Sequence, residues 1–169
     1  MVVACGAGEE RVGRPPDVPP SAPGALLVKP CDLVTRAEAE RFLGTPLDEG
    51  QTTSQPAVGQ SACVYHETGQ GGGGAMAQVA VSQTAAMPPG RLVSPEGLFR
   101  DIRRGGFPDA PRVEGVGDDA FLAPPGVHVL HRGYYLTLSV GLLRQDRERV
   151  LRELAATATA NLDRLLGNR

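Results

Sequence analysis

The stretch VHVLHRGYYLTLSV, residues 127–140, shows most clearly how this chain folds. Val127, Val129 and His131 mark alternate positions before Arg132-Gly133, and Tyr135, Thr137 and Ser139 mark them after it. A period of two is expected of a β-strand with one buried face. The Arg132-Gly133 pair interrupts the run, so the stretch predicts a β-hairpin.

Other segments upstream have the same character. Residues 75–84 are the clearest, because Val79 and Val81 alternate with polar or small neighbours. Glycine-rich residues 69–74 predict a flexible hairpin loop, and the polar residues 45–61 predict a longer loop. The links between strands are too short for parallel crossovers, so we expect a largely antiparallel sheet. The predicted strands are residues 62–68, 75–84, 112–115, 119–123 and two within 127–140.

Three segments predict helices. Thr35 and Glu38 have the spacing of a capping box at the start of the first helix. Ser94 followed by Pro95 is typical of the start of the second. The third, residues 145–166, carries one apolar stripe in steps of three or four residues. Strands and helices recur in a similar order in the two halves, which suggests a loose internal duplication.

This order of elements predicts an α+β fold, with helices packed on one face of a mostly antiparallel sheet. The chain has 22 glycines and 15 prolines among 169 residues, and many of them fall in residues 6–25. Five prolines there forbid a helix. We therefore expect residues 1–25 to be a lipobox-like start with a flexible, disordered tether, and residues 26–169 to be a single domain.

Cys31 and Cys63 lie just before the first predicted helix and in the first predicted strand. A bridge between them would close a loop of roughly thirty residues and contribute about 3–4 kcal/mol in the chain-entropy model. The alternative is a pair of reduced, buried thiols, as in most cytosolic proteins. The choice depends on the compartment.

Cys5 follows the small apolar residues Val2-Val3-Ala4, as the modified cysteine of a bacterial lipoprotein does. In such proteins the cysteine receives a diacylglyceryl group and becomes the new N-terminus. A signal peptide has a basic segment and about 7–15 apolar residues before the cleavage site, whereas only four residues precede Cys5. We therefore expect either that the true start lies upstream of Met1 or that the chain has been shortened. The alternative is an ordinary N-terminal cysteine without a lipid. Cys5 is thus the predicted lipid-attachment site, on the extracytoplasmic face of the cell membrane. There, oxidising conditions would favour the Cys31–Cys63 disulfide.

Several short motifs resemble one known family. They are Pro30-Cys31-Asp32-Leu33-Val34-Thr35, Ala62-Cys63-Val64-Tyr65 and Val116-Gly117-Asp118-Asp119-Ala120-Phe121. They are similar to the small actinobacterial envelope lipoproteins of the domain of unknown function 3558 family, or to sensor-like relatives, over roughly residues 30–166. The resemblance implies an envelope location and a disulfide. It implies no activity and no catalytic residues.

Candidate catalytic and metal-binding groups are few. His128 and His131 are three residues apart, so on a strand they face opposite sides and make a poor metal pair; either one would have to meet His66 across the sheet. Asp118-Asp119 is expected to form a turn rather than a cation site. The GxGxxG match at residues 69–74 lacks the helix that a phosphate site needs.

Two other groups have both a structural and a binding interpretation. Arg100, Arg103 and Arg104 are expected to complement the dipole of their helix, or alternatively to contact a partner or an anionic lipid. Tyr134 and Tyr135 should point to opposite faces of a strand, one into the core and the other covering the sheet or lining a ligand groove.

We therefore expect a non-enzymatic, membrane-tethered lipoprotein domain that needs no cofactor. Its expected partners are the membrane, through the lipid, and an envelope protein, a wall component or a small apolar ligand. A net charge of −2 without a dense basic surface argues against nucleic acid. The alternatives are an accessory or sensory subunit, and an envelope hydrolase in which Asp118, Asp119 and a histidine or glutamate converge in a pocket.

Overall fold

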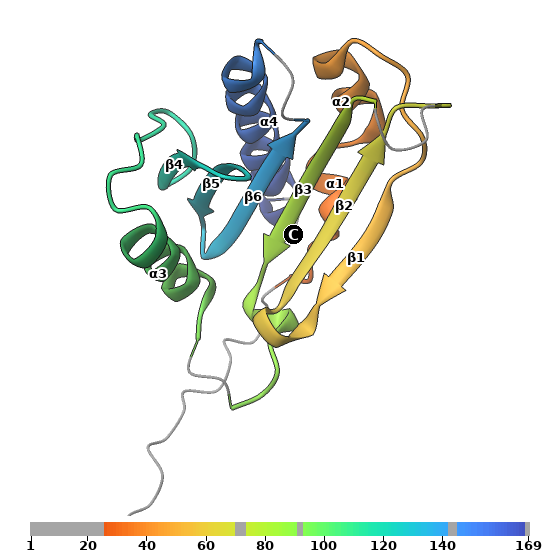
Figure 1. The fold of residues 1–169 in the computed structure, drawn as a ribbon. Coiled ribbons are helices and arrows are strands. Elements are labelled where there is room, and N and C mark those ends of the chain that lie inside the picture. Colours follow the sequence, from red (N-terminus) through yellow and green to blue (C-terminus); the bar gives the residue numbers. More distant parts are fainter. Residues whose placement is uncertain (1–25, 70–73, 91–92, 142–144, 168–169) are drawn as a thin grey trace, which may run out of the picture.

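The computed structural model describes residues 26–69, 74–90, 93–141 and 145–167. Its central feature is one six-stranded antiparallel sheet, in the order β1-β2-β3-β6-β5-β4 (Figure 1). The predicted α+β class and antiparallel sheet are confirmed. The predicted tether and Cys5 lie outside the described residues. The strands are β1 (Gln51–Gln55), β2 (Gln60–His66), β3 (Met76–Ser82), β4 (Asp119–Ala123), β5 (Gly126–His131) and β6 (Tyr134–Val140).

The hairpin predicted from residues 127–140 is formed by β5 and β6, with Val127 opposite Leu138 and His131 opposite Tyr134. Its turn has Arg132 at φ 49° and Gly133 at φ 78°. Strand β6 then pairs with β3, so two three-stranded meanders meet at the centre of the sheet.

Two predictions about strands were wrong. Residues 45–61 were expected to be a loop, but Gln51–Gln55 form the edge strand β1, whose five residues are all exposed. Such a strand has no apolar alternation because neither face is buried. Residues 112–115 make only a single bridge, from Arg112 to Phe121, because Gly115 turns away with a positive φ of 74°.

The helices are α1 (Pro30–Leu33), α2 (Arg36–Leu43), α3 (Pro95–Gly106) and α4 (Arg147–Gly167), with short 3₁₀ helices η1 (Pro56–Val58) and η2 (Thr84–Ala86). The predicted capping box is present: the Thr35 hydroxyl accepts from the backbone N–H of Glu38, whose carboxylate accepts from the N–H of Thr35. The Ser94 hydroxyl caps α3 in the same way, accepting from the N–H of Gly97.

Helices α1, α2 and α4 cover one face of the sheet and enclose the main core (Figure 1). Helix α3 is the exception to the predicted one-sided packing. Its Phe99 joins Phe121 and Tyr135 in a second cluster on the opposite face of β4–β6. Tyr134 and Tyr135 point to opposite faces as predicted, and both are buried because each face is covered at that point.

The Cys31–Cys63 disulfide joins α1 to β2, with its two Cα atoms 5.2 Å apart. Gly50 lies directly against it: a Cβ there would be 2.5 Å from the Cys63 sulfur and 2.8 Å from the Tyr65 ring. The predicted pairing is confirmed, and it holds the first helix onto the sheet.

Candidate functional site

A groove with a cavity volume of about 320 Å³ lies beside the first described residues, on the face of the sheet that carries α1. Most of the surface that lines it is apolar. Leu27, with 62% of its surface exposed, forms part of one wall. The full lining is Leu27, Val28, Lys29, Pro30, Thr52, Ser54, Pro56, Gly59, Gln60, Ser61, Gln83 and Ala86.

Gln83 holds this groove together. It follows β3 and is 1% exposed. Its side-chain oxygen accepts from the Val28 N–H at 2.7 Å, and its amide nitrogen donates to the Val28 carbonyl at 2.9 Å. Its backbone N–H donates to the Gly59 carbonyl at 3.0 Å. These bonds satisfy both polar groups of Val28, and they fix the extended segment that carries Leu27 and Lys29.

The groove can accept a slender ligand with an apolar body. Its volume is at the small end of the range of about 300–1,000 Å³ for ligand sites. Among the residues that line it, Lys29 is the charged one, so an anionic head group on the ligand would be matched there. The hydroxyls of Thr52, Ser54 and Ser61 offer further polar contacts.

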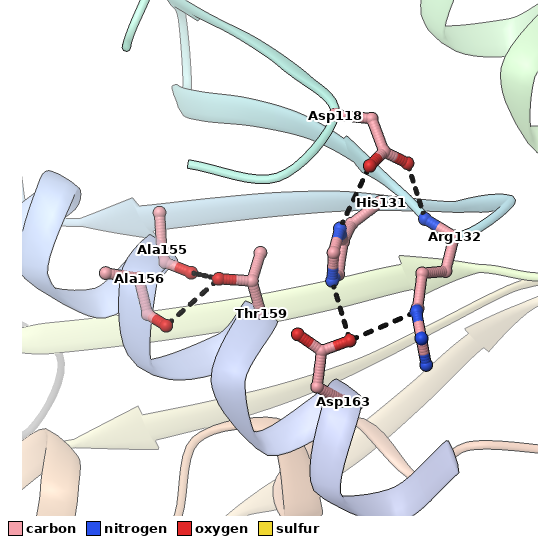
Figure 2. Close-up of polar contacts among 7 residues, drawn as sticks. All are labelled: Asp118, His131, Arg132, Ala155, Ala156, Thr159 and Asp163. Carbon is pink, nitrogen blue, oxygen red and sulfur yellow. Dashed lines mark hydrogen bonds and ion pairs between the residues drawn. The ribbon is translucent and has the colours of Figure 1, made fainter. Parts of the chain in front are cut away.

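A separate polar cluster ties the β5–β6 turn to α4 (Figure 2). The His131 ring lies between two carboxylates: its Nε2 is 3.1 Å from Asp163 and its Nδ1 is 3.5 Å from Asp118. The Arg132 guanidinium is 3.2 Å from Asp163, and the Arg132 backbone N–H donates to Asp118 at 2.8 Å. These contacts stabilise the positive φ of Arg132.

The envelope-hydrolase alternative would need Asp118, Asp119 and a histidine or glutamate to converge in a pocket. Thr159, the nearby hydroxyl drawn in Figure 2, donates within α4 to the carbonyls of Ala155 and Ala156. A neighbouring cavity of about 310 Å³ is lined by Arg132, but not by the His131 ring or its two carboxylates. The described contacts bring Asp118 and His131 together without Asp119, and they hold the β5–β6 turn against α4.

Asp119 does not join that cluster. It lies within 3.6 Å of Arg103 and 3.3 Å of Arg112. Arg103 also lies over the Phe121 ring. Arg103 thus links α3 to β4. This contact gives Arg103, one of the three arginines of the predicted basic cluster, a structural role. The turn that the sequence predicted at Asp118-Asp119 is present, with Gly117 at φ 60°.

His128 is buried against α3, on the opposite face from His131. Its ring stacks on Phe121 with centroids 4.6 Å apart. Its Nε2 donates to the Pro124 carbonyl at 3.3 Å, since a carbonyl can only accept, and its Nδ1 accepts from the Tyr135 hydroxyl at 2.6 Å. Burial lowers the pKa of His128 and raises that of Tyr135. Both groups are neutral at pH 7, and both side chains pack in the second core cluster.

Within the described residues, no group of three or more histidine, cysteine, aspartate or glutamate side chains is arranged to hold a metal. His66 lies at the end of β2 opposite Met76. The GxGxxG match falls partly on residues 70–73, outside the described residues, and β3 follows it.

The comparisons with other proteins add no assignment: no family model, no curated protein and no solved structure matches this chain. The helices that the structure describes include none with the length and hydropathy of a membrane span. The resemblance to the lipoprotein family therefore stays a prediction.

The sequence did not reveal the groove. Its walls come from three separate segments, residues 27–30, 52–61 and 83–86, and Gln83 looks like any polar residue after a strand. The one available signal was Leu27-Val28, an apolar pair between the proline-rich stretch and the first cysteine.

Proposed function

We propose that the protein is a lipid-anchored, extracytoplasmic binding domain, and that its groove takes a slender apolar ligand with an anionic head group. The observation that carries this proposal is the groove itself. It combines an apolar lining with one lysine, and a buried glutamine fixes its shape.

The disulfide supports the location. Structural disulfides persist in oxidising compartments and are rare in the cytosol. Cys63 is fully buried, and Gly50 leaves room for the sulfur pair, so the surrounding chain is fitted to the bridge. The predicted lipid on Cys5 would hold the domain at the extracytoplasmic face of the cell membrane, because two or three acyl chains give stable anchoring.

The position of the groove relative to that anchor also supports the proposal. About twenty residues separate Cys5 from Leu26, and we expect them to form the flexible tether between the lipid and the domain. The groove lies beside residues 27–30, at the start of the described domain. A ligand leaving the membrane would therefore have a short path to it.

A binding experiment tests the site. The chain with Cys5→Ser is titrated with a fluorescent long-chain fatty acid as the probe. Ala86→Trp would fill the groove and should weaken binding at least about tenfold, which corresponds to about 1.4 kcal/mol. Thr84→Trp is the matched control, because Thr84 lies two residues away in η2 and lines the neighbouring cavity instead.

Charge reversal tests the head group. Lys29→Glu should weaken binding of the fatty acid but leave binding of the corresponding uncharged alcohol unchanged. Equal affinities in the wild type, Ala86→Trp and Thr84→Trp would show that the probe binds elsewhere, and saturable binding to none of them would refute the proposed ligand class.

A further inference from the structure

The two edges of the sheet differ. Along β4, the segment before it covers the edge: the Val113 N–H donates to the Ala120 carbonyl at 3.0 Å, and the Leu122 N–H donates to the Pro111 carbonyl at 2.9 Å. Along β1, all five residues are exposed, and no strand of the described residues pairs with its outer side. Strand β1 is thus an open edge.

The hydrogen bonds of β2 show which groups of β1 face outward. The His66 carbonyl accepts from the Asp48 N–H on the β1 side, and the Gly59 carbonyl accepts from the Gln83 N–H on the β3 side. The N–H and C=O of one residue in an antiparallel strand point to the same side, and the side alternates along the chain. Even-numbered residues of β2 therefore bond to β1.

In the register of the pair, Thr53 lies opposite Ala62, and Gln51 and Gln55 lie opposite the even-numbered residues 64 and 60. These three residues of β1 use their backbone groups toward β2. Thr52 and Ser54 consequently direct their N–H and C=O groups away from the sheet. An edge with four such groups can pair with another strand.

The sequence of β1, QTTSQ, is nearly the same read in either direction. A twofold axis at Thr53 would place Gln51 opposite Gln55 of a second copy and Thr52 opposite Ser54. Each Thr52–Ser54 pair would exchange two backbone hydrogen bonds, which gives four in all. No charged side chain lies in the strand, whereas natural open edges are commonly protected by lysine or proline.

We propose that two copies of this chain pair antiparallel through β1, forming one continuous sheet with a twofold axis at Thr53. An interface between identical patches must be self-complementary, and this strand is. The partner has the chemistry of the strand itself: uncharged, short and rich in hydroxyl and amide side chains.

The pairing would bring two ligand grooves together, and this part of the inference rests on the proposed function. The side chains of Thr52 and Ser54 line the groove, so the groove reaches the sheet edge. With the twofold axis perpendicular to the sheet, both grooves lie on the same face, one on each side of the new strand pair. A joined site accepts a longer ligand than one groove of about 320 Å³.

Anchoring would strengthen a contact of this size. Five residues on each side form an interface below the roughly 800 Å² per partner of stable complexes, so pairing in dilute solution should be weak. Chains held on one membrane meet at effective concentrations that tethering raises to the millimolar range.

The test uses the full chain with Cys5→Ser, studied by sedimentation velocity up to about 1 mM, the concentration that tethering provides. Thr53→Lys would place two like charges directly opposite each other and should raise the dimer dissociation constant at least about tenfold. Gln51→Lys with Gln55→Glu would place opposite charges across the axis and should preserve or strengthen the dimer. The Thr53 side chain points away from the groove, so the lysine leaves the ligand site intact.

Cross-linking tests the register. Thr53→Cys should form an intermolecular disulfide, because facing residues in a non-hydrogen-bonded pair have Cα atoms about 4.5 Å apart. Gln51→Cys is the matched control: its two copies would be about 13 Å apart, beyond the reach of a disulfide.

A wild-type chain that stays monomeric at the highest concentration overturns the proposal, as does equal cross-linking by the two cysteine variants. The two proposals fail separately. A dimer that binds no fatty acid refutes the proposed ligand class and supports the pairing. A monomer that binds the fatty acid refutes the pairing and supports the ligand class.

Discussion

Removing the Cys31–Cys63 disulfide should cost this protein much of its stability. The two cysteines are 32 residues apart in sequence, and closing a loop of that size contributes about 4 kcal/mol in the chain-entropy model. Domains of this kind have a total stability of about 5–15 kcal/mol. At about 2–4 °C for each kcal/mol, the melting temperature should fall by roughly 8–16 °C.

Two perturbations separate the cross-link from packing. Adding a reductant to the wild type breaks the bond and leaves both sulfurs in place. Replacing both cysteines with alanine also removes the fully buried Cys63 sulfur and should cost about 1 kcal/mol more. Urea denaturation with and without reductant measures both effects, and the double variant should not respond to reductant. A loss below about 1 kcal/mol on reduction would contradict the chain-entropy reasoning.

Three further changes have expected outcomes that equilibrium unfolding can check. Gly50→Ala places a Cβ within 2.5 Å of the disulfide and should lower the free energy of unfolding by about 1–3 kcal/mol. Gly105→Ala, in α3 with open space around it, is the control and should be neutral or stabilising. Equal effects of the two changes would refute the close packing of Gly50 against the disulfide. Burial lowers the pKa of His128, so the unfolded state binds its proton more readily, and stability should fall as the pH drops below the unfolded pKa of about 6.5. Replacing both His128 and Tyr135 with phenylalanine should remove this pH dependence. If the double variant keeps the same pH dependence, other groups cause it. Gln83→Leu leaves two buried backbone groups without partners and should cost about 2–4 kcal/mol; a neutral result would show that the groove does not depend on this side chain.

Strong local signals accounted for the parts of the fold that could be predicted. The hairpin at residues 127–140 has a buried face and an interrupting glycine, and the helix at Thr35 has a complete capping box. Each of these signals comes from contacts within a few residues. The Cys31–Cys63 pair was predicted on the argument about compartment, and the structure contains it.

The features that escaped prediction depend on residues far apart in sequence. Strand β1 is exposed on both faces, so it carries no apolar period and exists because β2 offers its edge. Helix α3 lies on the second face because Phe99 meets Phe121 and Tyr135 there. The groove similarly needs Gln83 to reach back to Val28, 55 residues earlier.

The most direct test of the central claim is the mass of the N-terminal peptide of the protein, made from its own gene and recovered from cell membranes. Our account predicts a chain that begins at Cys5 and carries a diacylglyceryl group, and a Cys5→Ser variant that leaves the membrane fraction. An unmodified Cys5 on a protein found in the reducing cytoplasm, with Cys31 and Cys63 as free thiols, would contradict it.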